Sequence, residues 1–382
     1  MMISNTYQNS PGAQEFLAMI LDQIVGSQAS QASIEELGLA MATHVGLKRE
    51  RNEDRVAVAR IAAPDMETYT VALVCDGVGG SEAGDQAAAL AIASIICDLA
   101  QQQQSYPTLK DLASLLVRRA DDLVRKNLQG RGATTLVMLL ATTKGEVVGA
   151  NVGDSRAYSW DPRPRITQLV QITTDDTFEN ELKGLPDQGV GLINARGLQG
   201  RLSQAIGESG RSADDLRVQS FDKEDFSPGA VLGSDGLWRA AKDFETLVGN
   251  SPTPTDAVRR AIVLANWVGG VDNSSMIAIT DVEQLCGVSQ GRPPTGRRPK
   301  EIELWLPSSK VKILTGNWIS ESRPAPPPRA KQEKQEKQKL KSKKKESREP
   351  EAGLQLELEA VDSTGARPKI EVTINEEPKK NW

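Results

Sequence analysis

Nearly all of the regular hydrophobic patterning in this chain of 382 residues lies between residues 41 and 283. Short runs rich in β-branched residues predict strands, which come in groups at 55–61, 69–75, 134–141, 146–152, 156–160, 166–172 and 274–280. Apolar residues at helical spacing predict two consecutive helices, over 86–103 and 109–128, and a third over 255–268. Strands in clusters and helices in pairs favour an α+β layered domain over βαβ alternation.

The segments that flank this region differ from it in composition. We expect a single domain over 41–283, preceded by an N-terminal extension over 1–40 that contains one amphipathic helix. After the domain we expect three further parts: an extension with two short candidate strands over 284–318, a Pro/Lys-rich basic linker over 319–350, and a C-terminal segment over 351–382 to which the sequence assigns no fold.

Composition excludes several classes of function. Three cysteines without paired spacing and a single histidine exclude a disulfide framework, a thiolate zinc site and a histidine-rich metal site. No apolar run approaches the roughly 20 residues that cross a bilayer, so we expect a soluble cytoplasmic protein. The net charge is −5, although residues 319–350 carry 11 Lys and Arg against 5 Glu. This basic tail lacks interleaved aromatic residues, which disfavours nucleic-acid binding and leaves a docking arm for a protein partner open.

Acidic residues stand at the ends of predicted strands or in tight turns in four places. These clusters are 52–54, 76–80, 234–236 and 272–273, and in most of them a carboxylate is followed by Gly or Asn. Each one alone is typical of an ordinary turn. If the four converge, their mutual repulsion requires that they become protonated or bind cations. A set of oxygen ligands without His or Cys favours Mg²⁺ or Mn²⁺ over zinc.

Seven motifs then occur in a recognisable order. They are RERNEDR at 49–55, CDGVGG at 75–80, GATT at 132–135, ANVGDSRAY at 150–158, LSQAIG at 202–207, GSDGLW at 233–238 and VDNSSMIAI at 271–279. In order and composition this set resembles the metal-dependent protein phosphatases of type 2C, in particular members of bacterial type. The resemblance covers about 240 residues.

The resemblance implies a four-layer α/β/β/α sandwich, in which two antiparallel sheets are flanked by helix pairs, with a two-metal site at one edge. It implies that Asp76 bridges two Mn²⁺ or Mg²⁺ ions. Glu53 and the Gly77 carbonyl would join one ion, and Asp235 and Asp272 the other. By the same resemblance Asp54 would orient metal-bound water and Arg49 would grip the substrate phosphate.

The implied activity is hydrolysis of phosphoserine and phosphothreonine in proteins by a metal-activated bridging water. The phosphoprotein would belong to a Ser/Thr kinase pathway. Bacterial members often have an Asp just before the Gly-Thr-Thr segment that helps to bind a third ion. This chain has no acid there nearer than Asp122, so a third ion has no support. A second interpretation stays open, in which the chain is a catalytically weak or silent phosphatase-like scaffold that binds a partner through its tail.

Overall fold

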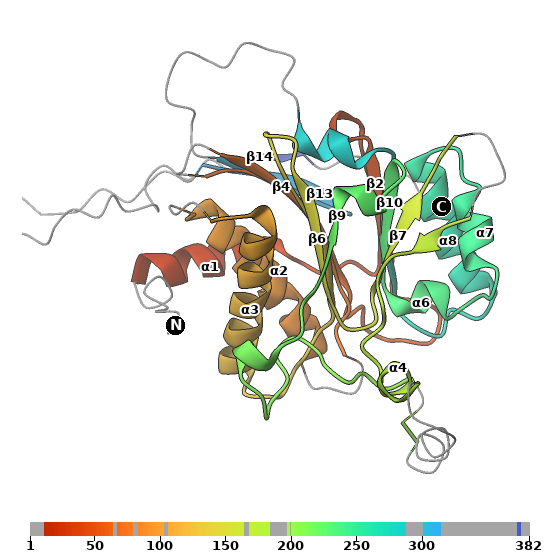
Figure 1. Cartoon of the computed structure of the whole chain (residues 1–382), viewed down its shortest axis with the longest axis horizontal. Helices are drawn as coiled ribbons and strands as arrows, with labels where there is room; N and C mark the ends of the chain where they lie inside the picture. Colours follow the sequence, from red (N-terminus) through yellow and green to blue (C-terminus); the bar gives the residue numbers. More distant parts are fainter. Residues whose placement is uncertain are drawn as a thin grey trace, which may run out of the picture. The chain divides into compact units, whose positions relative to one another are not determined.

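The computed structural model describes residues 11–63, 67–78, 83–102, 106–163, 168–183, 197–198, 200–287 and 301–314, and the backbone of 373–375. The chain divides into two compact units, Met1–Gly316 with Glu371–Trp382, and Asn317–Ile370. The second unit, which contains the whole of the predicted linker, lies outside the described residues. The first unit contains two antiparallel sheets (Figure 1). No helix among the described residues is both long and apolar enough to cross a membrane.

The first sheet has six strands in the order β1-β2-β11-β10-β7-β8. Their bounds are β1 Ala29–Ile34, β2 Leu39–His44, β11 Ser274–Ile279, β10 Gly229–Gly233, β7 Arg156–Trp160 and β8 Val170–Gln171. Every pairing is antiparallel, and β11 pairs with both β2 and β10. The first and last thirds of the domain are therefore joined in one sheet.

The second sheet has eight strands in the order β14-β13-β12-β3-β4-β5-β6-β9. Their bounds are β14 Thr373–Asn375, β13 Ser309–Leu314, β12 Glu301–Leu306, β3 Arg55–Ala62, β4 Thr68–Cys75, β5 Leu136–Thr142, β6 Val147–Val152 and β9 Gln219–Asp222. The two candidate strands near residue 300 are confirmed as β12 and β13, and they extend the sheet from β3.

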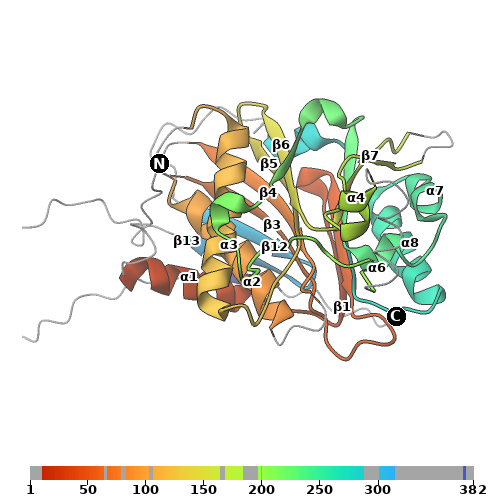
Figure 2. The ribbon, with the colours of Figure 1, turned by 60° about the horizontal axis from the view of Figure 1, so that its bottom comes forward.

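Helices cover the outer face of each sheet (Figures 1 and 2). The helices are α1 Pro11–Gln23, α2 Gly84–Ala100, α3 Leu109–Leu128, α4 Phe178–Leu182, α6 Asp235–Trp238, α7 Phe244–Gly249 and α8 Pro254–Trp267, with short 3₁₀ turns η1 Glu35–Leu37, η2 Ala213–Asp215, η3 Lys223–Asp225 and η4 Val282–Cys286. The pair α2 and α3 packs on β3, β4 and β6, while α8 packs on β2 and β11. The predicted sandwich of two antiparallel sheets with flanking helices is confirmed.

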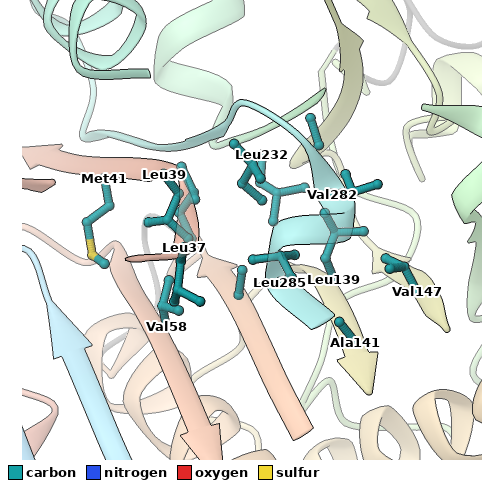
Figure 3. Packing of buried hydrophobic residues seen from close by; sticks show 14 of the residues in the cluster. Leu37, Leu39, Met41, Val58, Leu139, Ala141, Val147, Leu232, Val282 and Leu285 are labelled. Carbon is teal, nitrogen blue, oxygen red and sulfur yellow. The ribbon is translucent and has the colours of Figure 1, made fainter. Parts of the chain in front are cut away.

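The main core fills the space between the two sheets (Figure 3). Val58 and Leu139 come from one sheet, Leu39 and Leu232 from the other, and Leu285 from η4 closes one end. Each such fully buried aliphatic side chain contributes about 1.5–3 kcal/mol by leaving water. A second core, built on Trp160, Tyr158 and Phe244, joins the first sheet to α7 and α8. Packing on both faces explains why the central strands are almost continuously apolar.

Several elements differ from the sequence prediction. Helix α2 spans Gly84–Ala100 with Ala83 as its N-cap, whereas the sequence predicted a helix over 86–103. Fourteen of its 17 residues are buried, because α1, α3 and the sheet surround it. Strand β1 was not predicted because its sequence, ASQASI, lacks the bulky β-branched runs of the other strands. The predicted strand over 166–172 is reduced to Val170–Gln171 in the described residues.

Candidate active site

Four segments far apart in the sequence meet at one edge of the two sheets. Asp76 follows β4 directly, and Glu53 lies two residues before β3, the antiparallel partner of β4. Asp235 follows β10 as the first residue of α6, and Asp272 lies two residues before β11, the partner of β10. In an antiparallel pair the end of one strand lies beside the start of the next. The topology therefore gathers the predicted carboxylates from both sheets.

These carboxylates line a single cavity of about 480 Å³. Of the residues singled out from the sequence, the cavity is lined by Arg49, Glu53, Asp76, Gly77, Asp235 and Asp272. Asp154, at the turn between β6 and β7, lines it as well. The lining also includes Phe178 of α4 and several residues of the segment that follows it, Gly200, Arg201, Leu202, Gln204, Ala205 and Glu208.

Asn273 fixes the loop that carries Glu53. Its side-chain amide nitrogen donates to the backbone carbonyls of Val45 (2.8 Å) and Arg51 (3.0 Å). Its amide oxygen accepts a hydrogen bond from the backbone N–H of Glu53 (2.8 Å). Because the amide is buried, these bonds are shielded from competing water. This one residue, next to Asp272, therefore sets the spacing between Glu53 and Asp272.

Asp54 lies behind the cavity and does not line it. Its carboxylate accepts a hydrogen bond from the Ser234 hydroxyl (2.8 Å), and the same hydroxyl accepts one from the backbone N–H of Ser275 (2.9 Å). Burial raises the pKa of Asp54 to about 7, and this effect exceeds that of the hydrogen bonds from Ser275 and Ser234, which lower the pKa. The role that the family resemblance implies for Asp54, the orientation of metal-bound water, stays a prediction.

Gly77 is required by close backbone approach. A Cβ at this position would lie 2.5 Å from the Gly84 carbonyl carbon and 2.9 Å from the Glu53 carbonyl oxygen. Asp76 before it is held by Thr135, whose backbone N–H donates to the Asp76 carbonyl (2.8 Å) and whose hydroxyl accepts from the Asp76 N–H (3.0 Å). The main chain at the cavity floor is thus fixed independently of the Asp76 carboxylate.

Nearby positive charge does not balance the negative charge of the carboxylates that line the cavity. Burial raises the pKa of Glu53, Asp76 and Asp235, and it raises that of Asp154 to about 7. For Asp76 the shift places the pKa well above its ordinary value, and neighbouring carboxylates add to the effect of burial. Such carboxylates gain free energy from any cation that enters.

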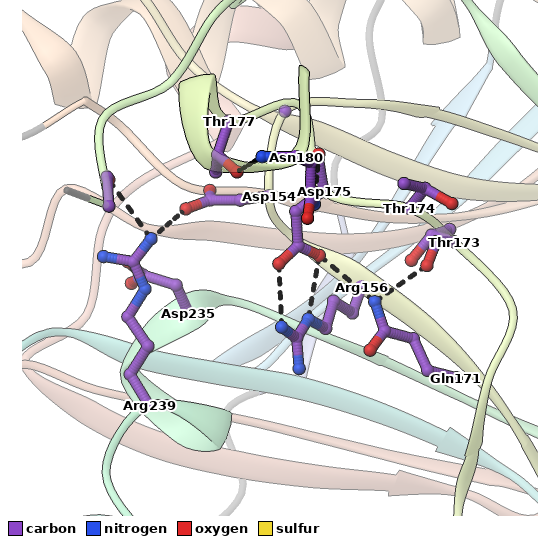
Figure 4. A network of polar contacts seen from close by, with 12 residues as sticks. Asp154, Arg156, Gln171, Thr173, Thr174, Asp175, Thr177, Asn180, Asp235 and Arg239 are labelled. Atoms are coloured by element: carbon purple, nitrogen blue, oxygen red, sulfur yellow. Dashed lines mark hydrogen bonds and ion pairs between the residues drawn. The ribbon is translucent and has the colours of Figure 1, made fainter. Parts of the chain in front are cut away.

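Two arginines already occupy part of this acidic surface. The Arg49 guanidinium lies 2.9 Å from an Asp272 oxygen, and that of Arg239 contacts Asp154 (2.7 Å) and Asp235 (3.2 Å) (Figure 4). Across the described ranges, no three His, Cys, Asp or Glu side chains are grouped closely enough to hold a metal ion as they stand. Two of the four predicted ligand carboxylates are instead paired with guanidinium groups.

Arg239 was not predicted from the sequence. It follows Asp235 by four residues across the short helix α6, a spacing that brings side chains together and could have identified it. Its guanidinium and that of Arg156 lie over the Trp238 ring, and Arg156 also pairs with Asp175 through two hydrogen bonds of 2.7 and 2.8 Å. This network fixes the wall of the cavity at α6 and β7 (Figure 4).

Comparison with known proteins agrees with this geometry. The family profile described as "Protein phosphatase 2C" matches residues 47–245, about half of the chain. The chain belongs to the protein phosphatase 2C family. The match includes every predicted site residue except Asp272, which lies beyond its end but lines the same cavity.

Three similar proteins share between 24% and 29% sequence identity with this chain. The serine/threonine phosphatase stp of Listeria welshimeri is 25% identical over 248 residues, which cover 62% of this chain and 93% of that protein. The serine/threonine protein phosphatase PstP of Mycobacterium tuberculosis is 29% identical over 256 residues, 64% of this chain and 45% of that protein. The crystal structure of the serine/threonine phosphatase Stp1 from Staphylococcus aureus superposes with a TM-score of 0.52 at 24% identity, and covers 67% of this chain and 98% of that one. This last similarity supports the fold alone.

Proposed function

We propose that this chain is a phosphatase that hydrolyses phosphoserine and phosphothreonine in proteins with the help of bound Mn²⁺ or Mg²⁺. The observation that carries the proposal is the convergence of Glu53, Asp76, Asp235 and Asp272 on one cavity with Arg49 at its edge. Membership of the protein phosphatase 2C family supports it, as does the similarity to the serine/threonine phosphatases of Listeria and Mycobacterium. The substrate would come from a Ser/Thr kinase pathway.

The residues present suit hard divalent cations. Their donors are carboxylate oxygens and the Gly77 carbonyl, and the repulsion among the carboxylates is relieved by positive charge. In the proposal Asp76 is shared between two ions, Glu53 and Gly77 join one, and Asp235 and Asp272 join the other. When bound, such ions supply Lewis acidity and lower the pKa of water at neutral pH. A third ion has no support, since Asp122 is paired with Arg125 and Lys126.

The chain's own side chains bind and orient the substrate. Arg49 offers a planar fork of N–H donors that matches phosphate, and it would exchange Asp272 for the phosphate oxygens. Asp54 would orient metal-bound water, and the hydrogen bond that it accepts from Ser234 keeps the start of α6 in position. Asn273 holds the Glu53 loop against the Asp272 loop.

The direct test is hydrolysis of a phosphothreonine peptide by the full-length chain. We expect turnover with Mn²⁺ or Mg²⁺, loss of at least about 10³-fold after chelation with EDTA, and recovery when the metal is restored. Calorimetry should detect two Mn²⁺ ions. Turnover that persists undiminished in EDTA contradicts the metal-dependent mechanism. A folded chain that neither binds Mn²⁺ nor releases phosphate would favour the scaffold interpretation.

The pairing of Arg239 with the acidic cluster leads to a second prediction. Because its guanidinium already neutralises part of the charge on Asp235 and Asp154, Arg239→Ala should bind Mn²⁺ about 3- to 10-fold more tightly. Calorimetric titration measures this directly. The matched control is Arg259→Ala, which removes an exposed pair with Asp256 on α8 and should leave Mn²⁺ affinity unchanged. Weaker Mn²⁺ binding by Arg239→Ala would mean that the arginine shapes the site rather than competing for it.

A further inference from the structure

Five exposed apolar side chains gather where the end of α8 meets the loop that precedes β3. This apolar patch consists of Leu47, Val263, Trp267, Val268 and Val271. Trp267 is 82% exposed and Val271 is 70% exposed. A tryptophan in water leaves a large apolar surface unburied, and a contiguous group of such residues is typical of a binding surface. Two other large exposed apolar residues of the described chain, Val170 and Leu314, belong to β8 and β13, which pair with neither β2 nor β11.

The patch is not an edge of the core. Helix α8 buries Ala257, Val258, Ala261 and Ala265 against the first sheet. Val263 and Trp267 are four residues apart and therefore share one face of the helix, which is exposed to solvent. Packing within the domain thus accounts for the inner face and gives no reason for a tryptophan on the outer one.

The patch is continuous with the edge of the cavity. The backbone N–H groups of Leu47 and Lys48 donate to the Gly270 carbonyl (2.7 and 3.1 Å), so the two loops lie against each other. Leu47 stands two residues before Arg49, and Val271 stands directly before Asp272, which is paired with Arg49. Since consecutive Cα atoms are about 3.8 Å apart, the patch begins within about 8 Å of this ion pair.

The charge beside the patch favours a phosphorylated partner. The exposed loop over 47–51 carries Lys48, Arg49 and Arg51 against the single acid Glu50. A surface that is apolar on one side and basic on the other matches a peptide with a phosphate at one position and an apolar side chain a short distance away. An extended chain advances about 3.3 Å per residue, so two to four residues span about 7–13 Å.

From these observations we infer that the apolar patch binds an aliphatic or aromatic side chain of the phosphoprotein substrate, two to four residues from the phosphorylated Ser or Thr. The inference rests on the proposed function and extends it to substrate choice. Trp267 is the anchor of the contact, since a tryptophan that becomes buried on binding commonly carries a large share of the binding energy. Arg49 holds the phosphate at the other end of the same peptide segment.

The test compares matched phosphothreonine peptides that carry either Leu or Gln two to four residues from the phosphothreonine, on each side. In the full-length chain with Mn²⁺ we expect kcat/KM to favour the best Leu peptide about tenfold over its Gln partner. Trp267→Ala should bring this ratio close to one, and Trp267→Phe should restore most of it. Val170→Ser, a change at an exposed apolar residue on β8, at the opposite edge of the first sheet from β1 and β2, should retain the full ratio. Fluorescence anisotropy of the same labelled peptides gives an independent measure of binding.

The outcomes separate this inference from the proposed function. Equal turnover of Leu and Gln peptides by the unmodified chain overturns the inference and leaves the phosphatase intact. If the chain shows no turnover but anisotropy still detects a preference for the Leu peptide that depends on Trp267, the proposed phosphatase activity is wrong and the inference about the patch stands. If the chain shows no turnover and no peptide binding, both are wrong. Two other occupants would also overturn it. If the C-terminal segment covered the patch, Trp267→Ala would increase the turnover of both peptides equally. If a second copy of the chain covered the patch, sedimentation would show a dimer that Trp267→Ala abolishes.

Discussion

Asp76→Asn should lower kcat/KM for a phosphothreonine peptide by at least about 10³-fold while leaving the protein folded. Phosphate monoester hydrolysis needs more than about 20 kcal/mol of catalysis, and no single acid or base supplies this, so loss of the shared ligand of a two-ion site removes most of the acceleration. Mn²⁺ binding measured by calorimetry should weaken together with activity. The amide has the shape of the carboxylate and lacks its charge, so the effect reports charge rather than packing.

The stability of the Asp76→Asn variant should increase, although its activity falls. Asp76 lies among buried like charges, and its backbone is held by Thr134 and Thr135 independently of the carboxylate. Without metal, the neutral amide relieves repulsion of about 1–3 kcal/mol, and the thermal midpoint should rise by a few degrees. A merely structural aspartate would behave differently, because its removal would lower activity and stability together.

Asp243→Asn is the matched control. Asp243 is an exposed N-cap residue of α7 whose side chain makes no capping hydrogen bond, and asparagine is an equally good N-cap. Activity, Mn²⁺ affinity and thermal midpoint should all stay as they are in the unmodified chain. If Asp76→Asn retained more than about a tenth of the activity, Asp76 would not be a shared ligand.

The positions of several acidic residues along the chain could be interpreted from the sequence. Asp76 and Asp272 each lie next to a predicted strand, and an antiparallel topology is enough to bring strand ends together. Strands β1 and β2 were missed because small residues alternate there without a clear apolar period. The limits of the domain at residues 41 and 283 stay a prediction, although β1 and β2 belong to its first sheet.

The sequence alone could not predict the contacts between side chains that are far apart along the chain. Arg239 pairs with Asp154 across 85 residues, and Asn273 holds a loop more than 200 residues away. The four-residue spacing from Asp235 could have pointed to Arg239, but its pairing with Asp154 and the contacts of Asn273 exist only in the folded chain. The same holds for Asp54, whose place behind the cavity depends on Ser234, 180 residues away.

One such distant pair should have the largest effect on stability. Asp121 of α3 is fully buried, and it accepts hydrogen bonds from the Arg211 guanidinium (2.8 and 3.0 Å) and from the backbone N–H of Gly207 (2.8 Å). Arg211→Met keeps the apolar part of the side chain and leaves the carboxylate buried without its cation. We expect the free energy of unfolding to fall by about 3–5 kcal/mol in denaturant titrations.

A double mutant distinguishes the loss of the attraction between Asp121 and Arg211 from the cost of leaving the Asp121 carboxylate buried without a cation. In Asp121→Asn/Arg211→Met no buried charge remains, and the asparagine oxygen can still accept from Gly207. We expect this pair to recover at least half of the stability lost in the single variant, because the main cost of breaking a buried ion pair is the charge left behind. Arg259→Met, which breaks an exposed pair on α8, should cost no more than about 0.5 kcal/mol.

The pair also connects stability to the cavity. Arg211 donates to the Ala205 carbonyl, and Gln204, Ala205 and Glu208 line the cavity. Arg211→Met should therefore raise KM for a phosphopeptide at temperatures where the variant is still folded, and the double variant should restore KM only in part, because the bond to Ala205 stays lost. Complete recovery of both stability and KM would mean that the hydrogen bond from Gly207 to residue 121 positions this segment without Arg211. A loss below about 1 kcal/mol in the single variant would mean that water reaches the carboxylate and the pair is not truly buried.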